Sequence, residues 1–128
     1  MAQFIWDEKY SVNNEVLDNH HKRLFVILNN LHKCCSAKAH RVTLSAIVEE
    51  LLSYASHHCE VEERHMKRIG YKHIKEHVSE HRLITDAIYK QQYKRDIKEV
   101  EITLETVSAL GKLLLDHILN EDMKYAKH

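Results

Sequence analysis

The chain contains no proline and only two glycines in 128 residues. Long helices can therefore run without the two residues that most often interrupt them. Leucine, isoleucine and valine recur three and four residues apart along most of the sequence, which places apolar side chains on one face of an α-helix. The pattern predicts an all-α fold, and the length suits a single domain over residues 1–128.

Four helices are predicted, and short connections between them favour an up-and-down four-helix bundle. Their approximate ranges are 15–36, 41–67, 71–92 and 96–126. We expect Gly70 to end the second helix. Asp96 is expected to cap the fourth, with Glu99 reaching back in a capping box. Gly111 lies inside the fourth helix, where it costs about 1 kcal/mol relative to alanine, and close helix packing would explain it.

Residues 1–14 have no helical periodicity and are predicted to form a non-helical arm. The arm contains four large apolar or aromatic side chains, Phe4, Ile5, Trp6 and Tyr10. Because these side chains are too apolar to be left in solvent, we expect the arm to pack across the bundle.

Each predicted helix has an inward face that mixes apolar residues with histidine or glutamate. These faces are Leu17, His21, Leu24, Leu28 and Leu31; Leu44, Ile47, Leu51, Ala55, His58 and Glu62; Ile74, His77, His81, Ile84 and Ile88; and Val100, Leu104, Val107, Leu114 and His117 or Ile118. Five inward imidazoles and two carboxylates would form an unsatisfied polar core without a metal. Seven ligands are more than the four that a tetrahedral zinc ion binds, and they suit a pair of iron ions.

The spacing of the polar residues supports one shared site. A spacing of four puts His58 with Glu62, and His77 with His81, on one face of a helix. The two pairs are centred at positions 60 and 79, equally far from the turn at Gly70. The chain has twelve histidines, so some spacings are accidental. We place His73 at the rim, and His20, His57 and His65 in solvent or outside the ligand set.

For the carboxylate that accompanies His117, spacing alone favours Glu121 over Asp122. Glu121 lies four residues after His117, which is the favourable spacing. Asp122 lies five residues after it and is rotated by about 140° on an ideal helix. Both carboxylates remain candidates on this basis.

Charge and cysteine content exclude several classes of partner. Lys plus Arg and Asp plus Glu each number 19 and are interspersed, so neither a nucleic acid nor an anionic membrane surface is expected as a partner. No apolar stretch approaches the roughly 20 residues of a membrane span, and the N-terminus does not resemble a signal peptide. The odd number of cysteines, with Cys34 next to Cys35, indicates free thiols. We expect a cytoplasmic protein.

Five motifs in order resemble those of the hemerythrins, especially the bacterial ones. They are Trp6-xxx-Tyr10-Ser11-Val12, Asp18-xx-His21-xx-Leu24, His58-xxx-Glu62-Glu63, His77-xx-Glu80-His81 and His117-Ile118-xxx-Asp122-xx-Tyr125. The resemblance covers almost the whole chain. It implies a four-helix bundle with a non-haem di-iron centre that binds dioxygen, and its histidine-to-aspartate spacing of five selects Asp122 over Glu121.

The resemblance also implies how the ligands divide. His77, His81 and His117 would hold one iron, and His21 and His58 the other. Glu62, Asp122 and an oxo or hydroxo group would bridge both. The second iron would then keep one open position, where dioxygen would bind.

A dioxygen pocket is expected beside these ligands. Leu24, Leu114 and Ile118 flank ligand positions and are our candidates for its apolar wall. Bacterial hemerythrins often have an aromatic residue where this chain has Cys59 and a tryptophan where it has Leu113, and both positions line or adjoin the pocket in the family. The shape of the pocket should therefore differ here.

Reversible dioxygen binding, for storage, delivery or sensing, is the function expected from these features. One alternative is a di-iron peroxidase-like or oxygen-reducing enzyme, in which Cys59 would act as a redox-active thiol. Another is an iron-buffering module. A protein electron donor or acceptor would be a further partner. The histidine-rich ligand set favours binding over oxidation, because it is less anionic than the carboxylate-rich sites of ferritin-like oxidases.

Overall fold

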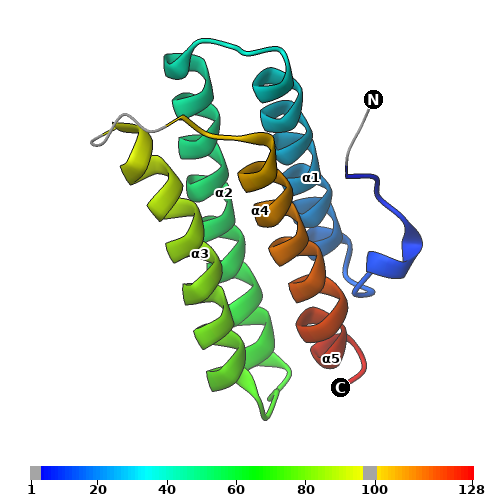
Figure 1. The fold of residues 1–128 in the computed structure, drawn as a ribbon. Helices are drawn as coiled ribbons and strands as arrows, with labels where there is room; N and C mark the ends of the chain where they lie inside the picture. Colours follow the sequence, from blue (N-terminus) through cyan, green and yellow to red (C-terminus); the bar gives the residue numbers. More distant parts are fainter. Residues whose placement is uncertain (1–3, 97–100) are drawn as a thin grey trace.

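The computed structural model describes residues 4–96 and 101–128, which form a bundle of four long helices (Figure 1). These helices are α1 (Glu15–Ser36), α2 (Arg41–Arg68), α3 (Ile74–Asp96) and α4 (Leu104–His117). Helix α1 packs against α2 and α4, and α3 packs against the same two helices. The predicted all-α, up-and-down four-helix bundle is confirmed. None of the helices in the described ranges is both long and apolar enough to span a bilayer.

The first helix begins where it was predicted, and the second ends at the predicted glycine. Helix α1 begins after Asn14, whose side chain accepts a hydrogen bond from the backbone N–H of Leu17. Helix α2 ends just before Gly70, whose φ of 67° lies in the left-handed region. The N–H of Tyr71 then donates to the carbonyl of Met66 at 3.0 Å. This wrapped C-terminus is the reason for glycine at this position.

The predicted start of the fourth helix is wrong. Asp96 is the last residue of α3, which begins at Ile74 and continues beyond the predicted end at residue 92 because Gln, Lys and Arg are good helix formers. Helix α4 is instead capped by Thr103, whose side chain accepts from the N–H of Thr106. Leu104 opens the helix and is 41% exposed, so its predicted inward position is also wrong. Glu99, the predicted capping-box partner, and Val100, predicted on the inward face, lie outside the described residues.

The N-terminal arm packs on the bundle as predicted. It contains one short 3-10 turn, η1 (Glu8–Tyr10), and is otherwise non-helical in its described part. The rings of Trp6 and Tyr10 lie 5.9 and 5.3 Å from the ring of Phe25 on α1. Phe4 is also buried, whereas Ile5 is 70% exposed, contrary to the expectation that all four apolar side chains would be covered.

The core is divided by a polar layer. The larger apolar cluster includes Leu28, Leu51 and Ile88, and a smaller one surrounds Met66 and Tyr125. At this level α4 continues into a π-helical turn, η2 (Ile118–Asp122), and then into a final short helix, α5 (Met123–Ala126), whose Tyr125 belongs to the smaller cluster. The polar layer contains the predicted site.

Candidate metal centre

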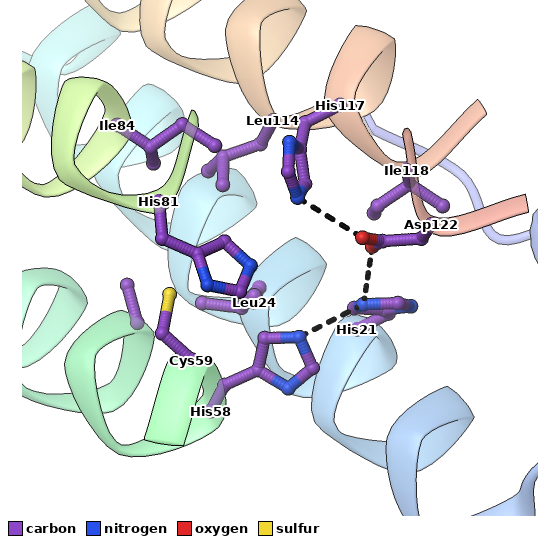
Figure 2. A pocket seen from close by; sticks show the side chains of 11 residues that line it. His21, Leu24, His58, Cys59, His81, Ile84, Leu114, His117, Ile118 and Asp122 are labelled. Atoms are coloured by element: carbon purple, nitrogen blue, oxygen red, sulfur yellow. Dashed lines mark hydrogen bonds and ion pairs between the residues drawn. The ribbon is translucent and has the colours of Figure 1, made fainter. Parts of the chain in front are cut away.

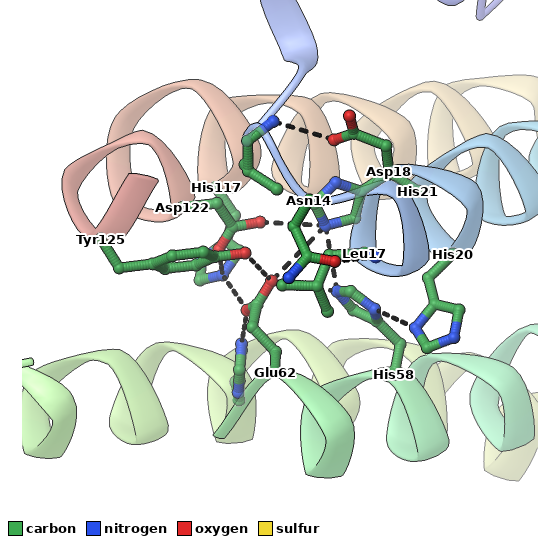
Figure 3. A network of polar contacts seen from close by, with 12 residues as sticks. Asn14, Leu17, Asp18, His20, His21, His58, Glu62, His117, Asp122 and Tyr125 are labelled. Carbon is green, nitrogen blue, oxygen red and sulfur yellow. Dashed lines mark hydrogen bonds and ion pairs between the residues drawn. The ribbon is translucent and has the colours of Figure 1, made fainter. Parts of the chain in front are cut away.

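The structure brings the seven predicted ligand residues together in the interior of the bundle. They come from all four long helices and from η2: His21; His58 and Glu62; His77 and His81; His117; and Asp122. None is more than 8% exposed. Figure 2 shows the side chains of His21, His58, His81, His117 and Asp122 converging from different helices, and Figure 3 shows Glu62 among them. The arrangement is what bundles use to build metal sites from facing helices.

Glu62 lies at the middle of the cluster. Its Oε1 is 2.9 Å from Nε2 of His77 and 2.8 Å from Nε2 of His81. Its Oε2 is 3.2 Å from Nε2 of His58 and 3.5 Å from Nε2 of His21. The two oxygens of this carboxylate therefore face two different sets of imidazoles.

Asp122 bridges the same two sets from the other side. Its Oδ1 lies 2.9 Å from Nε2 of His77 and 3.0 Å from Nε2 of His117, and its Oδ2 lies 3.1 Å from Nε2 of His21. The π-helical turn explains how a residue five positions after His117 reaches this place. A π-turn adds one residue per turn, so the aspartate returns to the inner face, and such turns are common at functional sites.

The donor atoms form two groups that share both carboxylates. In one group, Glu62 and Asp122 lie with His77, His81 and His117. In the other, the same two carboxylates lie with His21 and His58. Within each group, the donor atoms lie within 4.8 Å of one another. This division fits two metal ions bridged by two carboxylates.

Contacts between the ligand atoms are unfavourable without a shared cation. Nε2 of His21 lies 3.0 Å from Nε2 of His58, and Nε2 of His117 lies 3.1 Å from Nε2 of His77. Both carboxylate oxygens of Asp122 are buried and accept no hydrogen bond of good geometry. Lone pairs that converge in this way are costly to bury unless a metal or protons occupy the space between them. The residues present therefore fit a metal pair.

In the metal-free cluster, the histidines and carboxylates strongly shift one another's pKa values. Burial lowers the pKa of His21, but Asp122 and Glu62 outweigh it and raise the pKa to about 9. The same balance raises the pKa of His77 to about 9 and that of His117 to about 10. Burial opposes ionisation of Glu62, yet the surrounding histidines hold its pKa well below the ordinary value. Without metal, bound protons thus supply the positive charge that the carboxylates need.

These pKa shifts predict a pH-dependent stability of the metal-free protein. His21, His77 and His117 bind more protons folded than unfolded between pH 6.5 and about 9 to 10. Their contribution is complete below pH 6.5 and is lost as the pH rises through their folded pKa values. We expect the urea midpoint of the metal-free protein to fall from pH 7 to pH 10, and that of the metal-loaded protein to fall much less. A midpoint that is constant or rises over this range in the metal-free protein would contradict the assignment.

Two further contacts of the cluster were not predicted. The hydroxyl of Tyr125 donates to Oε2 of Glu62 at 2.8 Å, and Nδ1 of His81 lies 2.8 Å from Oε2 of Glu63. Helical spacing could have indicated the tyrosine, because Tyr125 lies three residues after Asp122. For Glu63, which lies next to a ligand in sequence, spacing gives no comparable signal.

Histidines outside the ligand set lie mostly where they were predicted. His57 and His73 are exposed. His65 packs its ring 5.6 Å from that of Tyr125. His20 is half-buried, and its Nδ1 lies 3.0 Å from Nδ1 of His58. His20 is therefore outside the ligand set but in contact with it.

A cavity of about 20 Å³ adjoins both donor groups (Figure 2). Besides five of the ligand residues, its wall is formed by Leu24, Ala55, Cys59, Ile84, Leu114 and Ile118. All four predicted pocket residues are among them, and Ala55 and Ile84 were predicted only as core. A cavity must have a volume of roughly 10–15 Å³ to hold one water molecule. This cavity therefore has room for a ligand the size of one water or one diatomic molecule.

Cys59 lines both this cavity and an outer cleft of about 240 Å³ between α2 and α3, as does His81. Ser56, Glu60, Val78 and Thr85 are among the other residues of the cleft. Burial, followed by the nearby carboxylates, raises the pKa of the Cys59 thiol. All three cysteines are free, as predicted. A neutral buried thiol is a poor nucleophile, so Cys59 acts here as a wall rather than as a reactive group.

The chain is similar to known proteins along nearly its whole length. Residues 12–128 match the family model described as the hemerythrin HHE cation binding domain. Bacteriohemerythrin of Pseudomonas aeruginosa is 29% identical over 98% of this chain and 80% of that protein. Bacteriohemerythrin of Campylobacter jejuni is 31% identical over 92% of this chain and 89% of that protein. The crystal structure of a wild-type hemerythrin superposes with a TM-score of 0.92 at 26% identity, covering 98% of this chain and 97% of the other.

Proposed function

Because the chain belongs to the hemerythrin family, we propose that it binds dioxygen reversibly at a non-haem di-iron centre. The observation that carries the proposal is the small apolar cavity that touches both donor groups. The iron pair, when bound, supplies the electrons and the open coordination position that dioxygen binding requires. The residues of the chain hold the pair, shape the space beside it and keep water out.

In the proposed centre, Glu62 and Asp122 would hold both irons, together with an oxo or hydroxo group. The three-histidine group would hold one iron, and His21 and His58 would hold the other. The second group offers one nitrogen donor fewer, so a metal held there would keep a position available to a small ligand. Both of these histidines line the cavity.

The lining of the cavity favours binding over further reaction. Apart from the ligand residues, it offers aliphatic side chains and one thiol. Such a wall slows the entry of water and contains no carboxyl, amine or free imidazole to deliver a proton. An enzyme that reduces dioxygen would need that proton donor. The apolar wall therefore supports a carrier or sensor rather than the peroxidase-like alternative.

The test of the function is optical and analytical. Protein loaded with ferrous iron under anaerobic conditions should contain two irons per chain. Exposure to air should produce a visible absorption that disappears when oxygen is removed and returns when it is restored. One tightly bound zinc with no retained iron would contradict the di-iron centre. Two irons without a reversible spectrum would instead favour iron buffering.

The position of Cys59 between the cavity and the outer cleft leads to a prediction about the autoxidation rate of the oxygenated protein. The cavity of about 20 Å³ cannot accept a phenyl ring, but the outer cleft of about 240 Å³ can. In Cys59→Phe, the ring should occupy the cleft, close the route for water and slow autoxidation several-fold. The added volume should cost about 1–3 kcal/mol of stability.

Two smaller substitutions complete this series. Cys59→Ala should open the wall and speed autoxidation, and Cys59→Ser tests whether the thiol itself reacts. A thiol-dependent reductase activity would vanish in Cys59→Ser, whereas oxygen binding should persist. If Cys59→Phe folds with two irons and autoxidises as fast as the unmodified protein, Cys59 does not limit the entry of water.

A further inference from the structure

The imidazole of His58 has a polar partner on each side of its ring (Figure 3). Nε2 faces the centre, 3.2 Å from Oε2 of Glu62 and 3.0 Å from Nε2 of His21. Nδ1 faces outward and lies 3.0 Å from Nδ1 of His20. By contrast, the buried Nδ1 atoms of His21, His77 and His117 have no hydrogen-bond partner. His58 is therefore oriented by a second imidazole.

The contact between two Nδ1 atoms fixes the tautomers of both rings. A hydrogen bond at this distance needs one proton between the two nitrogens, so one ring donates and the other accepts. If His58 donates from Nδ1, its Nε2 carries a lone pair toward the centre. If His20 donates, Nε2 of a neutral His58 carries the proton and cannot bind a metal. Only the first arrangement is compatible with metal binding by His58.

We propose that His20 is a positioning residue, which accepts the Nδ1–H of His58 and so presents the Nε2 lone pair of His58 to the metal. This inference rests on the proposed metal pair and adds the residue that sets the tautomer at one half of it. Hydrogen-bond acceptors of this kind orient metal-binding histidines and increase their basicity. Here the acceptor is a neutral ring, whereas His81 has the carboxylate of Glu63 in the same role.

Packing contacts fix the position of the His20 ring. Its ring packs edge-on against that of Tyr54 on α2, with the ring centroids 5.9 Å apart. His20 itself is on α1, next to His21. The acceptor is thus fixed between two helices before any metal binds. Because His58 supplies one of only two nitrogens in its donor group, the effect of His20 should fall on that metal ion.

Cobalt binding provides the test, since Co²⁺ has visible absorption bands that report its coordination. Titration of metal-free protein should show two bound ions. In His20→Ala, the affinity for one of them should fall by about 10–100-fold, the usual effect of removing such a partner, and the other should be unchanged. His20→Asn should restore most of the affinity, because its amide oxygen can accept from His58.

His57→Ala is the matched control. It removes a neighbouring imidazole that touches His20 but leaves the bond between His20 and His58 in place. This variant should bind both Co²⁺ ions like the unmodified protein. Equal affinities in His20→Ala and His57→Ala, or an equal loss of both ions in His20→Ala, would overturn the proposal.

A direct measurement does not depend on any variant. In zinc-loaded, ¹⁵N-labelled protein, NMR should detect a coupling across the hydrogen bond between Nδ1 of His58 and Nδ1 of His20, with the proton on His58. An absent coupling, or a proton on His20 Nδ1, would contradict the proposal. Neither experiment uses dioxygen, so a failure here is distinguishable from a failure of the oxygen-binding function.

Discussion

Asp122→Ala should abolish the bridged metal pair. The carboxylate contacts histidines from both donor groups, so its removal takes one ligand from each ion at once. The loss of metal affinity should exceed the roughly 10–100-fold that follows when only a hydrogen-bond partner of a ligand is removed. Metal analysis of anaerobically loaded protein should find fewer than two irons per chain and no reversible oxygen spectrum.

Glu121→Ala is the control for this prediction. Glu121 lies at the spacing that an ideal helix would favour, yet its carboxylate faces outward and pairs with Nζ of Lys124 at 3.4 Å. Loss of such a half-exposed ion pair costs at most about 1 kcal/mol, and both irons should remain. If Glu121→Ala lost the metals and Asp122→Ala kept them, the π-helical turn would not exist in solution.

The same region shows where inference from periodicity ends. A regular helix rotates Asp122 away from His117, and no residue between them signals the extra residue of a π-turn. The motif resemblance selected Asp122 without a physical reason, and the structure supplies that reason. For α1, α2 and α3 the spacing was sufficient, because His21, His58, Glu62, His77 and His81 lie on regular helices.

Other features depend on contacts between elements that are distant in sequence. The contact of His20 with His58 joins α1 to α2, and that of Tyr125 with Glu62 joins α5 to α2. Periodicity gives the face of a helix but not the partner that a half-buried side chain finds there. The prediction of the start of α4 was wrong for a local reason. Asp96 and Thr103 are both good capping residues, and the sequence alone did not show which one would be used.

Gly111→Ala should destabilise the protein, although alanine is the better helix former. A Cβ at position 111 would overlap the ring of Phe4, which covers this point of α4. The arm holds Phe4 there through its backbone, which exchanges two hydrogen bonds of 2.7 Å with the side chain of Asn29. The glycine therefore makes room for the arm rather than for another helix, which corrects the expectation of close helix packing.

The sign of the effect follows from two opposing magnitudes. Alanine should gain about 1 kcal/mol in helix propensity. Displacing the buried phenyl ring should cost about 3–5 kcal/mol, the range for deleting a buried phenylalanine. The net loss should be about 2–4 kcal/mol in urea unfolding of the metal-free protein.

The decisive measurement is the same substitution in a Phe4→Ala background. With the ring gone, the closest contacts of the new methyl group are removed, so Gly111→Ala should now stabilise the protein by about 1 kcal/mol. A reversal of sign of this kind is a coupling between residues in contact and cannot arise from helix propensity alone. If Gly111→Ala stabilises the protein in both backgrounds, Phe4 does not pack on α4, and the arm contributes little to the bundle.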